Sequence, residues 1–396
     1  MINIALLGFG TVGKGAYEIL TNKKDSIKRV VGEEVQVKKI LKRNLNFKTE
    51  IDKSLFTDNF EDIILDEDIK LIVEMTGDVE KSYIYIKKAL NSKKHVITAN
   101  KGVVSEYFEE FLEIADKNKV AFLYEAAVAG SIPIITPLKS QVITNDISRV
   151  RGILNGTSNF LLTNMQVRKS KYDEILKEAQ DLGYAEADPY DDVEGVDALR
   201  KLRILSTIAF KSSIKNEEIL RRGMSTIDLN DILYLEKHRQ KIKLIAESRM
   251  EDGAFKSVVE PVILEVGDEL YGIDGAENIV EIYGENYGSL SFAGEGAGSL
   301  PTGNAIVSDV IDALGGNYYP VEITRHLENK SSDIYAKYYI RINRKINLDG
   351  ENWIHSFENH EDYIIVSTNT IKRSFLLDKI RELNLSENEY FFARFN

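Results

Sequence analysis

Residues 3–20, NIALLGFGTVGKGAYEIL, decide the fold of the first part of the chain. The apolar run at 3–7 predicts a short buried strand, and the residues after Gly13 have the apolar spacing of a helix. Between them lies GxGxxG, the glycine pattern that places a strand, a tight turn and a helix N-terminus around the pyrophosphate of a dinucleotide. A glycine-rich turn that binds nothing is the alternative. The candidate cofactor contacts in this motif are Gly8, Phe9, Gly10, Thr11, Val12 and Gly13.

Strand and helix patterns go on alternating to about residue 130. This alternation is typical of a doubly wound α/β domain with a parallel sheet, whose ligands bind at the carboxyl ends of the strands. Thr76, Asn100 and Lys101 directly follow two of the expected strands and are therefore candidate cofactor contacts. For Lys101, a surface lysine at a helix start is an equal alternative. The expected strands are 35–41, 69–75, 95–99 and 120–124, and the expected helices are 82–91 and 106–118.

The end of the second strand bears on which dinucleotide is bound. An NAD-binding fold usually places an acidic residue there, against the ribose 2′-hydroxyl. Here Lys42 and Arg43 occupy that place, and positive charge suits a 2′-phosphate. We therefore expect NADP in preference to NAD, with Arg43 or Lys42 as the phosphate contact.

A second polar constellation lies at 181–210, DLGYAEADPYDDVEGVDALRKLRILSTIAF. Asp197 and Lys201 are four residues apart on an expected helix and so share a face, which continues into Leu205 and Ile208. A lysine where an apolar stripe begins is either paired with a carboxylate or shifted toward its neutral form, and such a lysine can donate a proton. The plainer interpretation is an exposed ion pair of small energetic effect.

Three loop segments have two interpretations each. Asn155, Gly156 and Thr157 form either a turn with a helix cap or a set of hydrogen-bonding groups for a small polar ligand. Glu125, among small residues, either organises oxygens around a hard cation or marks a bend between domains, and the residues alone favour the bend. GEGAGSLPT at 294–302, which contains Gly298, is either a connector or a loop that closes over the cofactor.

The remaining patterns predict an antiparallel sheet followed by a small separate module. Sheet strands are expected at 242–247, 255–264 and 278–283. After a linker at 329–332, the module is expected to contain strands at 337–343, 362–367 and 390–395 and a helix at 374–383.

Composition excludes several classes of function. The net charge of −12 argues against a nucleic-acid partner. The absence of cysteine excludes a thiol nucleophile and a thiolate metal site, and the five histidines show no metal-ligand spacing. No apolar run reaches membrane-spanning length and no signal peptide precedes the first strand, so a cytoplasmic protein without membrane contact is expected.

Six motifs, taken in order along the chain, resemble those of homoserine dehydrogenases. The resemblance extends over residues 2–318 and implies NAD(P)-dependent interconversion of L-aspartate 4-semialdehyde and L-homoserine, a step toward threonine, methionine and isoleucine. The motifs are GFGTVG (8–13), TANKG (98–102), YEAAVAGSIPII (124–135), RGILNGTSNF (151–160), GYAEADPYDDVEGVDALRKLRIL (183–205) and GEGAGSLPTGNAIVSDVIDAL (294–314).

The resemblance also implies roles for single residues. Lys201 matches the family's catalytic lysine, and Lys101 matches a second lysine at the reacting oxygen. Glu186 resembles the residue that binds the polar end of the substrate, with Asp192 and Asp197 as supporting carboxylates. A monovalent cation site, usually sodium and built mostly from backbone oxygens, matches Glu125, Val128, Gly130 and Ile132.

Three domains and a homodimer follow from the same resemblance. A dinucleotide-binding domain is expected at 1–134, completed by a helix at about 303–318. A catalytic and dimerisation domain is expected at 135–320, with its sheet at about 135–150 and 255–320. A ferredoxin-like, ACT-like module is expected at 331–396. Its residues 344–361 are too few and too polar for the usual first helix, so we expect packing or dimerisation instead of threonine binding.

Two other functions compete with this interpretation. Another amino-acid dehydrogenase with the same first domain would have no use for the polar residues between Glu186 and Lys201. A non-catalytic amino-acid sensor would have no need of Lys201.

Overall fold

The computed structural model describes residues 1–396 and divides the chain into two compact units. Unit 1 consists of Met1–Asn145, Thr207–Ser213 and Gly294–Thr324, and unit 2 of Asp146–Ser206, Ile214–Ala293 and Arg325–Asn396. No helix has both the length and the apolar character needed to cross a membrane.

Unit 1 is built on a parallel six-stranded sheet in the order β3-β2-β1-β4-β5-β6, the strand order of dinucleotide-binding folds. The expected doubly wound domain is confirmed. Its strands are β1 (Ile2–Leu7), β2 (Val35–Leu41), β3 (Phe56–Thr57), β4 (Ile69–Glu74), β5 (His95–Thr98) and β6 (Phe122–Leu123). Its helices are α1 (Thr11–Asn22), α2 (Lys24–Val31), α3 (Glu61–Ile64), α4 (Val79–Asn91), α5 (Lys101–Asn118), α6 (Ile135–Thr144) and α12 (Ser299–Gly315).

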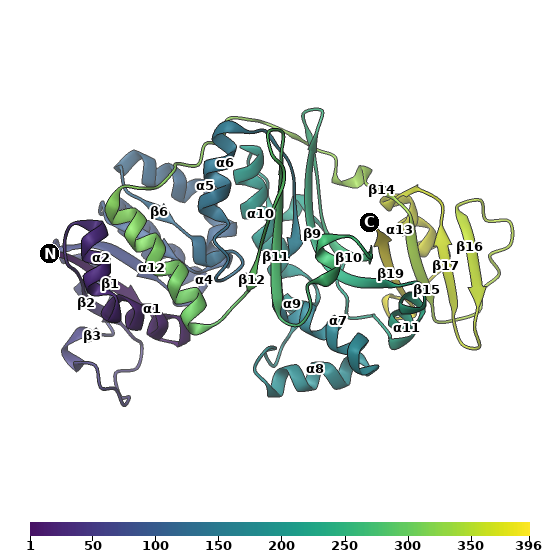
Figure 1. Ribbon diagram of the computed structural model, residues 1–396, viewed down its shortest axis with the longest axis horizontal. Helices are drawn as coiled ribbons and strands as arrows, with labels where there is room; N and C mark the ends of the chain where they lie inside the picture. The colour runs from purple at the N-terminus through teal and green to yellow at the C-terminus, as the bar shows by residue number, and fades with distance from the viewer. The chain divides into compact units, whose positions relative to one another are not determined.

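Helix α12 returns to the first residues of the chain and crosses α1 at very short range (Figure 1). A Cβ atom on Gly15 would lie 2.2 Å from the carbonyl oxygen of Ser299, and one on Gly303 would lie 2.7 Å from the backbone nitrogen of Ala16. Glycines on both helices therefore make this contact possible, and they fix the loop before α12 against the start of α1.

Unit 2 is built on a mixed sheet of eleven strands with the main path β12-β11-β7-β9-β10-β19-β15-β17-β16. As expected of an antiparallel sheet, β9 pairs antiparallel with β10, and β7 pairs antiparallel with both β9 and β11. Its longer strands are β7 (Ile147–Ile153), β9 (Gln240–Glu251), β10 (Ala254–Glu265), β11 (Glu277–Gly284), β12 (Gly288–Glu295), β15 (Tyr338–Ile342), β16 (Ile354–Asn359), β17 (Ile364–Thr368) and β19 (Tyr390–Phe395). The two-residue strands are β8 (Leu220–Arg221), β13 (Glu328–Asn329), β14 (Tyr335–Ala336) and β18 (Ile371–Lys372). The helices are α7 (Gly156–Arg168), α8 (Tyr172–Asp181), α9 (Tyr190–Val193), α10 (Val196–Phe210, ending in unit 1), α11 (Leu229–Lys237) and α13 (Arg373–Glu382).

The last strands have the ferredoxin-like order of fourth, first, third and second strand, β19-β15-β17-β16 (Figure 1). The prediction that the first helix is missing is confirmed, because the segment between β15 and β16 is a loop whose Leu348 and Trp353 fill the core instead. The module is not separate, however. Strand β19 pairs with β10 at Val262 and Arg394, which makes one continuous sheet.

Several expected elements differ from the structure. Residues 135–144, expected in a sheet, form helix α6. The Glu125 side chain accepts hydrogen bonds from the first N–H groups of this helix. Residues 329–332, expected as a linker, pack on β10, where Ser331 is buried and accepts a hydrogen bond from the Ser257 N–H. Helix α5 begins five residues before the expected start, and non-helical dihedrals at Tyr107 mark the point where the helical pattern breaks.

Candidate active site

A cavity of about 630 Å³ lies at the carboxyl ends of the strands in unit 1. The glycine motif, the end of β2 and the start of α4 supply its walls. Its lining residues are Gly8, Phe9, Gly10, Leu41, Lys42, Arg43, Asn44, Asp58, Met75, Thr76, Asp78, Lys81 and Tyr85. Of the residues predicted to contact the cofactor, Gly8, Phe9, Gly10, Arg43 and Thr76 line this cavity. The others, which are Thr11, Val12, Gly13, Asn100, Lys101 and Gly298, do not.

The three motif glycines differ in what surrounds them. A Cβ atom on Gly8, whose φ is +102°, would lie 2.8 Å from the carbonyl oxygen of Met75, and one on Gly13 would lie 2.5 Å from that of Gly8. A Cβ atom on Gly10 would meet no atom within 4 Å. Gly8 and Gly13 are thus required by packing, whereas the space beside Gly10 is open at the N-terminus of α1, where no side chain caps the N–H groups. A nicotinamide dinucleotide fits this arrangement.

The loop before α12 lies at the same helix start. Gly298 is the N-cap of α12 with φ +137°, and the Ser299 hydroxyl donates to the carbonyl oxygen of Thr11 at 2.7 Å. Ser299, the residue after Gly298, thus joins the glycine motif to the start of α12.

Thr76 and Asn100 belong to a hydrogen-bond network centred on a residue that sequence reasoning missed. Buried Glu74 accepts hydrogen bonds of 2.7 Å from the hydroxyls of Thr76, Ser82 and Thr98. The Asn100 amide donates to the Ser82 hydroxyl and its Oδ1 caps the N-terminus of α5. Lys101 is the first residue of α5 and is half-buried at this edge.

The Glu125 side chain has a structural partner. Its carboxylate accepts three backbone N–H groups at the start of α6, those of Ile134, Ile135 and Thr136, at 2.6–2.8 Å. The chain contains no group of three or more His, Cys, Asp or Glu side chains placed to hold a metal. In the same turn, Gly130 has φ +60°, and a Cβ atom there would lie 2.2 Å from the carbonyl oxygen of Gly296. A cation site here would have to use backbone oxygens.

In unit 2, Lys201 is buried and held from two sides. Its Nζ donates to the carbonyl oxygen of Leu154 at 2.6 Å and lies 2.7 Å from Asp197 Oδ2. Only 7% of Lys201 and 2% of Asp197 is exposed. The expected shared helix face is confirmed, and the alternative of an exposed ion pair is wrong.

Asn155 ties this pair to the following loop. Its Nδ2 donates to Asp192 Oδ1 at 2.7 Å and to Asp197 Oδ2 at 2.9 Å, while its Oδ1 accepts from the Ser158 N–H as the cap of α7. The helix-cap interpretation of this segment is confirmed, and the same side chain also contacts two of the predicted carboxylates.

The other predicted substrate contacts surround this cluster. The Thr157 hydroxyl donates to the carbonyl oxygen of Tyr184 at 2.7 Å, and Gly156 is packed against the backbone of Ala276. The Glu186 side chain is exposed, and the contact of this residue with the rest of unit 2 is a backbone one, from the Gln180 amide to its carbonyl oxygen. The structure thus brings together Asn155, Asp192, Asp197 and Lys201, but not Glu186.

Lys243, a buried lysine that the sequence analysis did not single out, supports helix α7 through Asn159. Lys243 on β9 donates to Asn159 Oδ1 at 2.8 Å, to the carbonyl oxygen of Ile273 at 2.6 Å and to Asp274 Oδ1 at 3.0 Å. Burial lowers the pKa of Lys243 to about 8, against the opposing effect of Asp274. The sequence predicted a strand at 242–247 but gave no sign that Lys243 is buried within it.

Two family models match this chain. The family model described as homoserine dehydrogenase matches residues 133–311, and that described as homoserine dehydrogenase, NAD binding domain, matches residues 8–125. The homoserine dehydrogenase of Bacillus subtilis is 38% identical over 354 residues, which cover 87% of this chain and 82% of that protein. That of Lactococcus lactis is 35% identical over 357 residues, 86% of this chain and 82% of that protein.

Solved structures give the same result. The homoserine dehydrogenase of Thiobacillus denitrificans superposes with a TM-score of 0.91 at 32% identity, covering all of this chain and 98% of that one. A hyperthermophilic archaeal homoserine dehydrogenase mutant in complex with NADPH shares the fold, with a TM-score of 0.67 at 24% identity over 79% of this chain and 97% of that one. The chain therefore belongs to the homoserine dehydrogenase family of NAD(P)-dependent oxidoreductases.

Proposed function

We propose that Lys201 is the proton donor when this homoserine dehydrogenase reduces L-aspartate 4-semialdehyde to L-homoserine. The observation that carries the proposal is the buried Lys201 ammonium fixed by the Leu154 carbonyl oxygen and Asp197. Reduction of an aldehyde needs a proton at the carbonyl oxygen as negative charge develops there. A bound nicotinamide dinucleotide supplies the hydride. In the reverse direction, Lys201 takes the proton from the alcohol.

The residues around Lys201 are proposed to bind the substrate. Asp192 and Asp197 suit the ammonium group of the amino-acid substrate and are oriented by the Asn155 amide. Gly156 and Thr157, at the N-terminus of α7, suit its carboxylate. Glu186 is proposed to reach the substrate from its exposed loop, and Lys101 to stabilise the negative charge on the substrate oxygen.

NADP is the proposed cofactor. Lys42, Arg43 and Asn44, which follow β2 directly, line the 630 Å³ cavity and include no acidic residue. Lys81, on the same cavity, is paired with Asp78 at 3.0 Å. Arg43 is exposed and able to reach a 2′-phosphate, whereas Lys42 lies over the Phe47 ring at 4.7 Å. Arg43 is therefore the preferred phosphate contact.

A sodium ion is proposed to bind backbone oxygens of the turn at Glu125, Val128, Gly130 and Ile132. The positive φ of Ala129 and Gly130 bends this turn tightly, as convergence of several carbonyl groups on one ion requires. The Glu125 carboxylate is then a cap for α6 and supports the turn without binding the ion.

We also propose a homodimer, a cytoplasmic location and domains at 1–134, 135–320 and 331–396. The open edge of the eleven-stranded sheet at β12, where side chains are exposed or half-buried, supports self-association.

The test is NADPH oxidation with L-aspartate 4-semialdehyde by the wild type and by Lys201→Met. A fall in kcat of about 10²-fold or more is expected in the variant. Lys177→Met, at an exposed lysine of α8, is the matched control and should retain full activity. Full turnover in Lys201→Met would contradict the proposed role of Lys201.

A further inference from the structure

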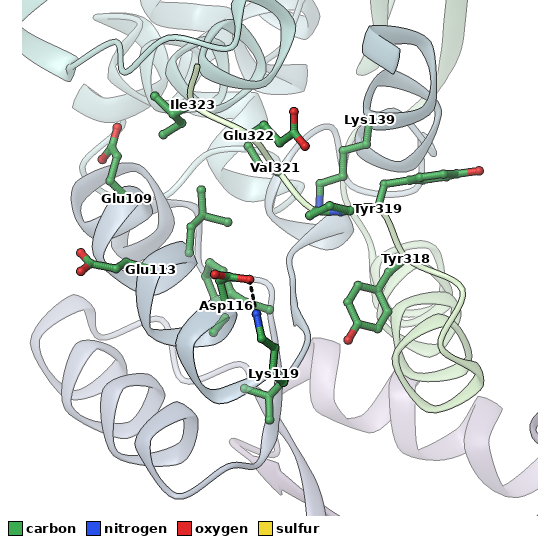
Figure 2. A pocket seen from close by; sticks show the side chains of 15 residues that line it. Glu109, Glu113, Asp116, Lys119, Lys139, Tyr318, Tyr319, Val321, Glu322 and Ile323 are labelled. Atoms are coloured by element: carbon green, nitrogen blue, oxygen red, sulfur yellow. Dashed lines mark hydrogen bonds and ion pairs between the residues drawn. The ribbon is translucent and has the colours of Figure 1, made fainter. Parts of the chain in front are cut away.

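Two cavities of unit 1 share a wall formed by Lys139 and by residues 319–322. The larger, about 610 Å³, lies between the C-terminal half of α5, the residues leading into β6 and the segment after α12 (Figure 2). The smaller, about 300 Å³, lies between α6 and that same segment. Neither shares a lining residue with the cavity at the glycine motif. The proposed cofactor and substrate residues leave this space unassigned.

Lys139 places a cation at the inner wall of both cavities. Only 4% of the residue is exposed. Its ammonium lies over the Tyr124 ring, whose centroid is 4.5 Å away. Figure 2 shows the side chain extending from α6 toward Tyr319. Burying an ammonium is costly, and a bound anion would reduce that cost.

Glu125 and Asp309, the two carboxylates whose charges act on Lys139, have other hydrogen-bonding partners. Glu125 accepts the three N–H groups at the start of α6, and Asp309 accepts the Glu125 N–H at 2.8 Å. Burial raises the pKa of Asp309 well above its usual range, and the charge of Glu125 adds to the rise. The charge of Lys139 opposes that rise, and burial in turn lowers the pKa of Lys139 to about 8, so at pH 7 its ammonium form predominates.

The outer wall of the larger cavity has the opposite charge. Of its four carboxylates, Asp116 pairs with Lys119 at 3.0 Å and Glu109 accepts the Ser213 hydroxyl at 2.6 Å. Glu113 and Glu322 are exposed at the rim. The cavity is thus lined by two exposed carboxylates as well as by the buried Lys139.

We propose that this cavity is a second small-molecule site that binds an amino-acid zwitterion, with the ligand carboxylate on Lys139 and the ligand ammonium toward Glu113 and Glu322. A carboxylate–ammonium contact out of bulk water is a charge-assisted hydrogen bond of the stronger kind. The acidic rim repels phosphates and dicarboxylates, so a ligand with one negative charge and one positive charge is favoured. The volume lies within the range of small-ligand cavities.

The experiment uses ligand-observed NMR and thermal unfolding of the full chain at pH 7 with NADPH present. The probes are L-2-aminobutyrate, butyrate and butylammonium, which have the same carbon chain length and differ in their charged groups. L-2-Aminobutyrate is expected to bind best, butyrate about fivefold more weakly, and butylammonium without a measurable signal.

Variants identify the site. Lys139→Met keeps the apolar stem and is expected to weaken L-2-aminobutyrate about tenfold or more. Lys117→Met, at an exposed lysine of α5 that does not line the cavity, is the matched control and should bind as the wild type does. Glu113→Gln with Glu322→Gln, both at exposed positions, should weaken L-2-aminobutyrate and leave butyrate unchanged or tighter. This pair decides the question if Lys139→Met fails to fold.

Two results would overturn the proposal. One is binding of L-2-aminobutyrate that Lys139→Met and the double glutamine variant leave unchanged. The other is binding that is lost in Lys201→Met, because the probe would then occupy the proposed substrate site.

Discussion

Asp197 Oδ2 lies 2.7 Å from the Nζ of Lys201, one helical turn further along α10, and both side chains are buried. The same Asp197 oxygen accepts the Asn155 amide, so one carboxylate holds the ammonium and the helix cap of α7 together. The orientation of Lys201 thus depends on groups from three parts of unit 2, which are α10, the end of β7 and the start of α7.

Replacing Asp197 by Asn should separate charge from shape at this position. The amide keeps the size of the side chain but leaves the buried Lys201 ammonium without its counter-ion, so we expect kcat to fall by about 10-fold to 10²-fold. Steady-state NADPH oxidation measures the effect. Asp191→Asn, at an exposed carboxylate paired with Arg200, is the control and should retain activity. Equal kcat in wild type and Asp197→Asn would show that the ion pair does not orient Lys201.

The Asp197–Lys201 pair could be predicted because a helix repeats every 3.6 residues, so sequence spacing fixes which side chains share a face. The same holds for the turn at Gly8, whose neighbours on both sides have clear periodicity. The Leu154 carbonyl oxygen could not be predicted as a partner of Lys201, because every residue carries a carbonyl and only tertiary packing selects one.

Helix α6 and the extent of helix α7 were not predicted, although a helix cap at Asn155, where α7 begins, was one of two interpretations of that segment. The start of α6 is capped by Glu125, which lies about ten residues earlier in the sequence, so no local cap signal exists. Helix α7 is buried on several sides, with Phe160, Leu161 and Met165 all in the core, and therefore lacks an apolar stripe. Glu74 was hidden because one carboxylate in an apolar strand gives no pattern.

Charge at the end of β2 should determine the choice of dinucleotide. Arg43→Glu places a carboxylate where a 2′-phosphate is expected, so KM for NADPH should rise by about 10-fold or more while KM for NADH changes little. Arg29→Glu, at an exposed arginine of α2, changes the net charge equally and should leave both values unaltered. An equal rise for the two cofactors would sink the assignment of Arg43.

Arg394 joins the last strand to the catalytic sheet through two buried carboxylates. Its Nη2 lies 2.6 Å from Glu247 and its Nε 2.8 Å from Glu260, with 6% of the residue exposed. Arg394→Met should lower the free energy of unfolding by about 3–5 kcal/mol, because it leaves buried charge with fewer partners. Urea unfolding measures this. Arg381→Met, which removes an exposed pair with Asp378, should cost about 1 kcal/mol or less.

The same cluster predicts how acid destabilises unit 2. Burial alone would raise the pKa of Glu247, but Arg394, Arg149 and Arg249 together bring it well below its usual range. Because the pKa of Glu247 is lower in the folded state than in the unfolded one, its stabilising effect is complete above the unfolded value of about 4.5 and is lost as the pH falls below it. The stability of Glu247→Gln should therefore depend less on pH below about 4.5 than that of the wild type. Parallel pH dependence in urea unfolding would contradict this account.

Two glycines near the start of α1 should respond differently to the same added methyl group. A Cβ atom on Gly10 meets no atom within 4 Å, so Gly10→Ala should fold with an unchanged thermal midpoint. Its methyl group nevertheless occupies the space proposed for the pyrophosphate and should weaken NADPH binding about tenfold. A Cβ atom on Gly15 would lie 2.2 Å from the Ser299 carbonyl oxygen, so Gly15→Ala must push α12 away from α1. We expect it to cost about 1–3 kcal/mol in thermal unfolding. Loss of stability in Gly10→Ala, or unchanged NADPH affinity, would show that the open space beside Gly10 is not the cofactor site.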